Sequence, residues 1–238
     1  MLWRVGCADG SHFPCGLAWR GRAQTAQAVL LTSRRLGVRT LLQRYPTTAL
    51  GASEVNLLEL ATVYRTIASG ILAQPYVIRE IATESGGVLS GGRQPQLPLA
   101  ADDGALVLIP EGLRGCVRIP TGTAHALAAS SCPIPVMGKT GTTNECKDAL
   151  CVGSTCGVRG ITIAVRIGFD DGRSRGSGET GGRVALPIFR DVMLKIYGDA
   201  IAGPVPAFPA EMEARITRYV LGDRADHVGR ASTVRIGR

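Results

Sequence analysis

Two apolar segments near the middle of the chain, Ala149–Val152 and Ile161–Phe169, constrain the fold most. Gly and Asp residues bound both, and short apolar runs between such turn signals are typical of buried strands. A third apolar segment, Ile134–Met137, leads directly into the sequence Lys-Thr-Gly-Thr at 139–142. The pattern therefore predicts a small sheet at the centre of the chain, with Lys139 on one of its strands.

The segments on either side of this predicted sheet have apolar residues at helical spacing, which predicts helices. Gln24–Leu36 is predicted to form a helix that ends at Gly37, with Ala28, Leu31 and Leu36 on one side. A second helix is predicted to begin with Ser53 as its N-cap and to end at Gly70. Pro110 is predicted to open a third, which runs to about Val117.

A fourth helix, Leu186–Tyr197, is amphipathic, so we expect it to pack on the strands. Its predicted apolar face consists of Ile188, Phe189, Val192, Met193 and Ile196. Tyr76–Ala82 and Val88–Leu89 flank Ser-Gly-Gly and predict a hairpin, whereas 91–98 reads as a loop. Residues 202–209 read as a Pro-rich linker, and a surface helix is predicted to follow at Ala210–Leu221.

The Lys-Thr-Gly sequence has a specific chemical use on a strand that borders a cleft. The Lys139 ammonium can attract a carboxylate, and the hydroxyls of Thr140 and Thr142 can donate hydrogen bonds to it. Gly141 has no side chain, so an extended peptide can lie against the strand. A solvent-facing Lys at a strand start is the simplest alternative. Phosphate binding by a P-loop is excluded, because the loop needs Gly where this chain has Pro133.

Several separated segments resemble one protein family. GKTGTTN, DALCVGST, VRIGFDDGRS and ETGGRVALPIFRDVM follow one another in the order seen in penicillin-binding proteins of the bifunctional, class A type. ALGASEVNLLELATVYRTIASG at 49–70 and PTGTAHAL at 120–127 also resemble this family, and the resemblance covers about residues 28–221. It implies an antiparallel sheet packed with helices, in an α/β (α+β type) fold. It also implies a peptidoglycan D,D-transpeptidase domain at 28–200, with 1–27 unassigned and 201–238 a linker, short helix and basic tail.

The resemblance assigns a catalytic role to Lys139 and substrate binding to Thr140, Gly141 and Thr142. The implied ligands are the D-Ala-D-Ala end of a peptidoglycan stem peptide and β-lactams, with no cofactor. The family nucleophile is the Ser of S-x-x-K, assisted by a Ser-x-Asn loop. No Ser in the printed sequence has Lys at the third following position, and no Ser-x-Asn occurs. We therefore expect a fragment that is inactive alone, and that exposes apolar sheet surface where the nucleophile helix would pack.

Three further residues depart from the family pattern. Cys146 and Cys151 stand where aromatic residues are common, and Glu145 where Asp is common. The seven cysteines form no C-x-x-C pair, so a metal site has little support; they are Cys7, Cys15, Cys116, Cys132, Cys146, Cys151 and Cys156.

Charge and hydropathy bear on whether the chain binds nucleic acid and whether it spans a membrane. The net charge is +8, and 27 residues are Lys or Arg, but these are scattered and only 5% of residues are aromatic. A solvated basic surface is therefore favoured over nucleic-acid binding. No stretch reads as a membrane span or a secretory signal, so we expect a cytoplasmic chain if it is expressed as written. The full-length family works at the periplasmic face of the inner membrane.

Three functional hypotheses remain open. The first is the fragment of a D,D-transpeptidase that carries the site for the substrate carboxylate. The second is a non-catalytic protein that binds cell-wall peptide or penicillin, or that pairs with a separate N-terminal half. The third is a serine hydrolase of the β-lactamase or D,D-carboxypeptidase kind, which would need the same missing Ser.

Overall fold

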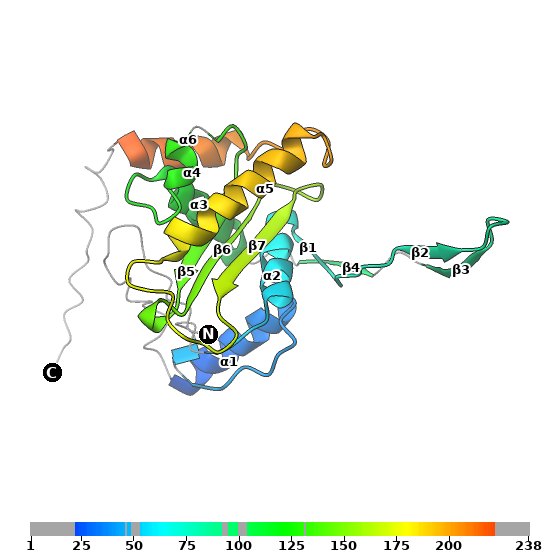
Figure 1. The fold of residues 1–238 in the computed structure, drawn as a ribbon, viewed down its shortest axis with the longest axis horizontal. Helices are drawn as coiled ribbons and strands as arrows, with labels where there is room; N and C mark the ends of the chain where they lie inside the picture. Colours follow the sequence, from blue (N-terminus) through cyan, green and yellow to red (C-terminus); the bar gives the residue numbers. More distant parts are fainter. Residues whose placement is uncertain are drawn as a thin grey trace.

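Three antiparallel strands in the order β5-β6-β7 form the centre of the computed structural model, which describes residues 22–45, 47–48, 53–91, 95–99, 104–130 and 132–221 (Figure 1). They are β5 (Met137–Thr142), β6 (Asp148–Ser154) and β7 (Thr162–Gly168). Thr140 on β5 lies opposite Cys151 on β6, which in turn lies opposite Val165 on β7. The three predicted strands are confirmed, and the Lys-Thr-Gly residues are part of β5.

Helices cover both faces of this sheet, with α2 (Leu57–Ser69) on one face and α5 (Leu186–Gly198) on the other (Figure 1). Successive strand residues point to opposite faces. Cys151 accordingly clusters with Phe189 and Met193 of α5, whereas Met137 packs near Ile67 of α2. This arrangement confirms the fold class, an antiparallel sheet packed with helices. Nearly all of β5 and β6 is buried, so the expectation of an exposed apolar sheet was wrong for these two strands.

The predicted apolar face of α5 is only partly buried. Phe189 and Met193 are buried in the core, but Ile188 and Val192 remain 44% and 41% exposed. The two exposed residues are four positions apart and form a separate stripe on the helix. The amphipathic pattern therefore predicted the helix correctly and its buried face too broadly.

The cap of α2 differs from the prediction. Asn56, and not Ser53, is the N-cap: its side chain accepts from the backbone N–H of Glu59, and the Glu59 carboxylate accepts from the N–H of Asn56. This reciprocal pair is a capping box. The hydroxyl of Ser53 lies 2.9 Å from that of Thr48 in the preceding loop. Gly70 ends the helix in the left-handed conformation, as expected.

Glu59 also fixes the loop that follows α1 (Arg22–Arg35). Its carboxylate accepts from the backbone N–H groups of Arg39 and Thr40, each at 2.8 Å, and from the Thr40 hydroxyl at 2.7 Å. Burial acts to raise the pKa of Glu59, but these hydrogen bonds outweigh burial and lower the pKa below its ordinary 4.5. The charged carboxylate is thus the form that the fold stabilises.

We expect this carboxylate to make stability depend on pH. Because its folded pKa is lowered, its contribution is present above about pH 4.5 and is lost as the pH falls through the folded pKa. Glu59→Gln should lower the free energy of unfolding at pH 7 by about 1 to 2 kcal/mol and flatten its dependence on acid pH. Urea unfolding from pH 7 to pH 3 measures both effects. Glu84→Gln, on an exposed turn, is the control, and equal pH profiles for the two variants would contradict the assignment.

The helix α1 ends before Gly37, whose φ of 110° requires glycine, as predicted. Its buried side differs from the expected one: Ala26 and Leu36 are buried, whereas Ala28 and Leu31 are exposed. Only Leu36 of the three predicted residues therefore faces the core.

The helix α3 (Gly104–Arg118) contains Pro110 instead of beginning there. A proline inside a helix removes one backbone hydrogen bond, which usually ends the helix. Here the packing of α3 against β5 and α6 (Ala210–Leu221) supports a continuous helix. The turn after α3 leads into the short α4 (Ala126–Ala129).

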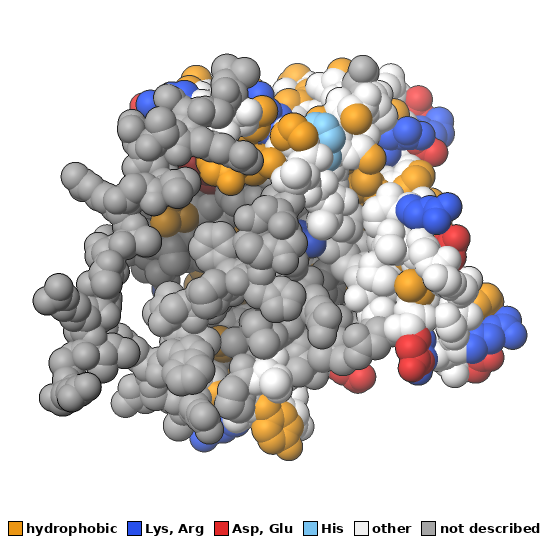
Figure 2. Space-filling model, turned by 90° about the vertical axis from the view of Figure 1, so that its left-hand side faces the viewer, with side chains coloured by type: hydrophobic (Ala, Val, Ile, Leu, Met, Phe, Trp, Pro, Cys, Tyr) orange, Lys and Arg blue, Asp and Glu red, His pale blue; other side chains and the backbone are white. Residues whose placement is uncertain are grey.

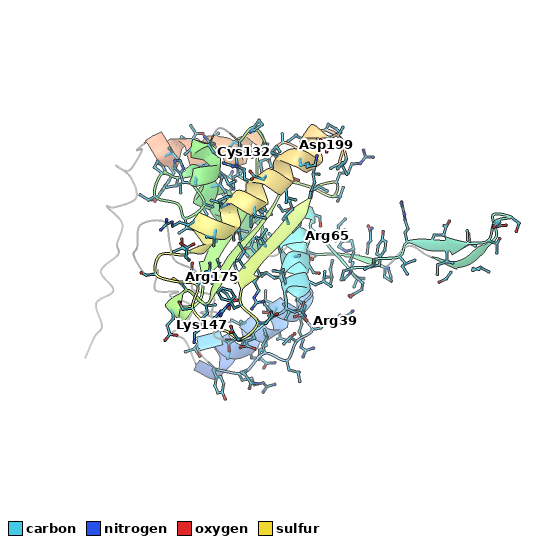
Figure 3. The ribbon with its side chains drawn as sticks, viewed as in Figure 1. Arg39, Arg65, Cys132, Lys147, Arg175 and Asp199 are labelled. Carbon is cyan, nitrogen blue, oxygen red and sulfur yellow. The ribbon has the colours of Figure 1, made fainter. Side chains whose placement is uncertain are left out.

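A narrow arm extends from the body between α2 and α3 (Figure 1). At its base β1 (Ile71–Ala73) pairs with β4 (Gln96–Pro98), and at its tip β2 (Glu80–Ala82) pairs with β3 (Val88–Gly91). The predicted hairpin is confirmed with a shorter first strand. The prediction of a loop at 91–98 was wrong for β4, and the Arg65 guanidinium supports the base by donating to the Ile71 carbonyl at 3.1 Å (Figure 3).

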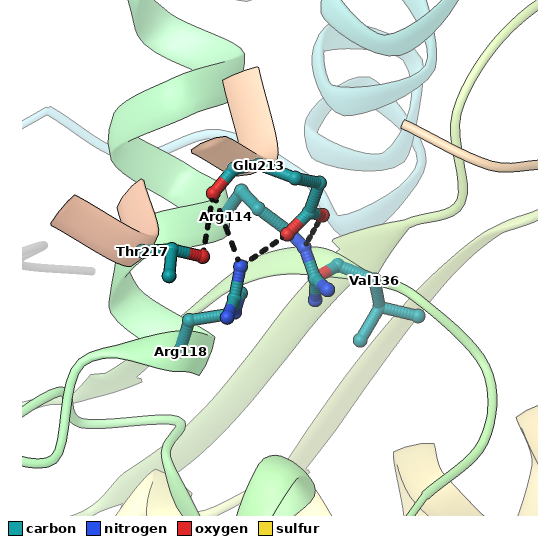
Figure 4. A network of polar contacts seen from close by, with 5 residues as sticks. All are labelled: Arg114, Arg118, Val136, Glu213 and Thr217. Atoms are coloured by element: carbon teal, nitrogen blue, oxygen red, sulfur yellow. Dashed lines mark hydrogen bonds and ion pairs between the residues drawn. The ribbon is translucent and has the colours of Figure 1, made fainter. Parts of the chain in front are cut away.

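The helix α6 has the predicted bounds and is held by an ion-pair network (Figure 4). Glu213 accepts from Arg114 at 2.7 Å and from Arg118 at 2.5 Å. Arg114 also donates to the carbonyl of Val136, directly before β5, at 2.9 Å. The network thus connects α6, α3 and the start of the Lys-Thr-Gly strand. Within the described ranges, every helix is too short or too polar to span a lipid bilayer.

Candidate functional site

The Lys139 ammonium lies against the outer edge of the sheet. Among the described strands β5 pairs only with β6, so its other edge is free of sheet partners. Lys139 is 6% exposed, and its Nζ donates to the Thr123 hydroxyl at 3.1 Å and to the Thr140 carbonyl at 2.8 Å. A solvent-facing Lys would be exposed, so this alternative is wrong.

The two threonines of the strand contact segments that are distant in the sequence. The Thr140 hydroxyl donates to the Thr123 carbonyl at 3.4 Å, and the Thr142 hydroxyl accepts from the backbone N–H of Gly181 at 3.0 Å. A hydroxyl that accepts one hydrogen bond keeps its own proton for donation. Thr142 therefore keeps a donor proton at the end of β5, the strand whose outer edge pairs with no other described strand.

Gly181 approaches the strands so closely that no side chain fits. A Cβ atom at this position would lie 2.3 Å from the Leu150 carbonyl oxygen and 2.4 Å from that of Gly141. The following π-helical turn, η3 (Gly181–Ala185), leads into α5. Such turns are frequent at functional sites. Here the turn places the Gly181 N–H against Thr142.

A second loop braces the turn between β5 and β6. Arg175 donates from Nε to the Lys147 carbonyl at 3.3 Å and also donates to the Glu179 carbonyl (Figure 3). Glu145 and Cys146, two of the positions that depart from the family pattern, have φ angles of 59° and 53°. Residues other than glycine rarely adopt such angles. The contacts of Arg175 support this unusual turn.

Cys151 lies opposite Thr140 in the pairing of β5 with β6, and its thiol is unreactive. It is buried beside α5, and burial raises the pKa of its thiol to about 12, although the Lys139 charge acts in the opposite direction. A thiol with such a pKa is neutral at pH 7 and a poor nucleophile. Among the described residues, no group of three or more His, Cys, Asp and Glu side chains is arranged to hold a metal ion.

The surface charge is mixed where the structure describes it. On the face in Figure 2, basic and acidic side chains lie interspersed in the described part. Several arginines are neutralised by neighbours, such as Arg166 by Asp148 at 2.7 Å and Arg215 by Glu111 at 2.7 Å. The net charge of +8 therefore does not form a continuous basic patch on the described part of this face.

Two residues at the site received no role from the sequence. Thr123 and Gly181 both lie in segments that resemble the family, in PTGTAHAL and ETGG. They contact Lys139 and Thr142 across 16 and 39 residues of chain. Periodicity and local motifs cannot reveal such contacts, because they depend on how distant turns fold onto one strand edge.

The chain is similar in sequence to known proteins. A family model described as "Penicillin binding protein transpeptidase domain" matches residues 28–194. Penicillin-binding protein 1A of Neisseria lactamica is 36% identical over 152 residues, which are 61% of this chain and 18% of that protein. The chain therefore spans less than a quarter of the length of this relative.

The fold is similar to those of solved structures. Penicillin-binding protein 1A from Haemophilus influenzae superposes with a TM-score of 0.60 at 24% identity, over 79% of this chain and 33% of that one. Penicillin-binding protein A from M. tuberculosis, solved as a ceftriaxone acyl-enzyme complex, gives 0.50 at 18% identity, over 71% and 44%. At these identities the likeness concerns the fold alone.

Proposed function

The chain belongs to the penicillin-binding protein transpeptidase family, and on this premise we propose that β5 forms the half of a peptidoglycan D,D-transpeptidase site that holds the substrate carboxylate. The observation that carries the proposal is the position of the Lys139 ammonium, buried at the edge of β5 that pairs with no other described strand. Lys139 supplies positive charge, and the hydroxyl of Thr142 supplies a donor. The Thr140 hydroxyl donates to the Thr123 carbonyl, so it would have to leave that carbonyl to donate to the ligand. The substrate would be a stem peptide ending in D-Ala-D-Ala, and a β-lactam would occupy the same position.

Acyl transfer also needs a nucleophile. A hydroxyl must attack the carbonyl carbon of the penultimate D-Ala, and the departing D-Ala amine must receive a proton. None of the Ser residues printed here lies in S-x-x-K. We therefore propose that these 238 residues bind the carboxylate but do not become acylated by themselves. An S-x-x-K segment, from a separate N-terminal half or elsewhere, would complete the site, which the family resemblance assigns to the periplasmic face of the inner membrane.

A titration followed by NMR tests the proposed site. We expect N-acyl-D-Ala-D-Ala to shift the backbone amide signals of residues 139–142 and Gly181, and the C-terminal amide of the same peptide to shift them much less. Lys139→Ala should weaken binding of the free acid about tenfold or more, since hydrogen bonds to charged groups are strong. Lys147→Ala and Lys195→Ala, both far more exposed, are the controls. Equal losses in all three variants would remove the case for Lys139.

Intact mass spectrometry after incubation with a β-lactam tests the proposal that the chain does not become acylated by itself. We expect no covalent adduct on the purified chain. A stoichiometric adduct would contradict the proposal, because it would locate a competent nucleophile within the sequence printed here.

A further inference from the structure

We propose that Thr123 is a positioning residue for Lys139, an inference that rests on the proposed function. Thr123 contacts both polar side chains at the centre of β5. Its hydroxyl accepts from the Lys139 ammonium at 3.1 Å, and its backbone carbonyl accepts from the Thr140 hydroxyl at 3.4 Å. One residue outside the strand therefore orients the Lys139 ammonium and holds the Thr140 hydroxyl, which would leave the Thr123 carbonyl when a carboxylate binds.

The turn that carries Thr123 has a fixed position on the end of α3. A Cβ atom on Gly122 would lie 2.2 Å from the Cys116 carbonyl oxygen, so only glycine allows this close approach. The same carbonyl accepts from the N–H of Ala124 at 3.3 Å. The His125 ring lies 3.2 Å, Nδ1 to oxygen, from the Val117 carbonyl. Contacts on both sides of Thr123 thus hold its hydroxyl beside β5.

The charge and length of the Lys139 side chain explain why this matters. Lysine has a flexible four-carbon stem, and its ammonium is strongly hydrated in water. The Lys139 residue is only 6% exposed, and its ammonium donates to protein acceptors such as the Thr123 hydroxyl and the Thr140 carbonyl in place of water. Loss of the Thr123 acceptor would leave a buried cationic donor less well satisfied, which favours other rotamers. The charge would then move away from the strand edge.

The sequence offers an unusually clean test, because Lys139, Lys147 and Lys195 are its only lysines. Selective labelling of lysine with ¹³C and ¹⁵N gives three side-chain signals by NMR. We expect Thr123→Val to shift the Lys139 ammonium signal and to speed exchange of its protons with water, while Lys147 and Lys195 stay unchanged. Thr123→Ser keeps the hydroxyl and should preserve the native signal. Thr121→Val, on an exposed residue of the same turn, is the matched control.

The same variants test the link to substrate. We expect Thr123→Val to weaken binding of N-acyl-D-Ala-D-Ala about tenfold, with Thr123→Ser and Thr121→Val within about twofold of the parent chain. A purely structural role would not produce rescue by Ser together with a change at Lys139 alone. If Thr123→Val does not give a dispersed amide spectrum, Thr123→Ala removes the same hydroxyl and replaces it in both experiments.

The outcomes separate the inference from the function on which it rests. An unchanged Lys139 signal in Thr123→Val would overturn the positioning role. A changed signal with unchanged peptide affinity would also overturn it, and would leave the proposed function intact. If the parent chain binds no peptide while the Lys139 signal still depends on the Thr123 hydroxyl, the proposed function fails and the positioning of Lys139 stands.

Discussion

Gly181→Ala is expected to disrupt the proposed carboxylate site and to destabilise the sheet. The added methyl would lie 2.3 Å from the Leu150 carbonyl oxygen and 2.4 Å from that of Gly141. Both neighbours are backbone atoms in the β5–β6 ladder, where Gly141 and Leu150 are paired. Neither strand can withdraw without breaking hydrogen bonds, so the segment that carries Gly181 must move away. This movement would remove the N–H that orients the Thr142 hydroxyl.

The expected loss in the free energy of unfolding of Gly181→Ala follows from the cost of overpacking. Forcing extra atoms into a filled interior costs about 1 to 3 kcal/mol, and the lost hydrogen bond adds about 1 kcal/mol. Urea unfolding should therefore show a loss of about 3 kcal/mol, and N-acyl-D-Ala-D-Ala should no longer shift the amides of 139–142. Gly198→Ala is the control, because a Cβ atom there meets nothing within 4 Å. Parent-like stability of Gly181→Ala would show that the segment does not pack on the sheet in this way.

Glu213→Ala should detach α6 from the rest of the protein. The Arg114 side chain is only 12% exposed, and that of Glu213 is 27% exposed. Removing the carboxylate leaves two guanidinium groups without their acidic partner. Breaking a fully buried pair costs about 3 to 5 kcal/mol, but these groups retain some water, so we expect about 2 kcal/mol.

Arg114 connects Glu213 to the candidate site, so the loss of stability should extend to β5. Its guanidinium also donates to the Val136 carbonyl and lies 5.2 Å from the centre of the Phe208 ring. We therefore expect Glu213→Ala to raise hydrogen exchange both in α6 and at the start of β5. Glu211→Ala, on an exposed residue of the same helix, should change neither. A loss of stability shared equally by the two variants would indicate a helix-propensity effect, and not the network.

The sequence predicted those elements whose signal is local. The three central strands, α5 and α6 follow from apolar runs, periodicity and turn residues within each segment. The N-cap of α2 is also present in the local sequence, because Asn56 and Glu59 have the spacing of a capping box. Ser53 is a residue type that is equally common at N-caps, so residue type alone does not distinguish the two positions. The prediction that α3 begins at Pro110 was wrong, because the packing that supports an unbroken helix cannot be deduced from the local sequence.

The candidate site was predictable only in part for the same reason. Lys139 and Thr142 lie in one recognisable motif, so their presence on one strand could be predicted. The burial of Lys139, and its contact with Thr123, depend on a turn fixed by Gly122 against Cys116. A glycine that permits close approach looks the same in sequence as one that permits flexibility. Sequence reasoning therefore located the strand but not the residues that orient its side chains.

The network around Glu213 also constrains the order in which the protein can fold. Its two ion pairs join positions separated by 99 and 95 residues. Contacts between such distant positions form late, since the loop must close before they contribute. During synthesis, Ile67 and Leu113 are already available to pack against Met137, but the cluster on that sheet face stays incomplete until Met212 and Ile216 leave the ribosome. The strand that carries Lys139 is therefore translated well before it can be fully enclosed, and this interval is when its apolar face is most open to misassembly or to chaperones.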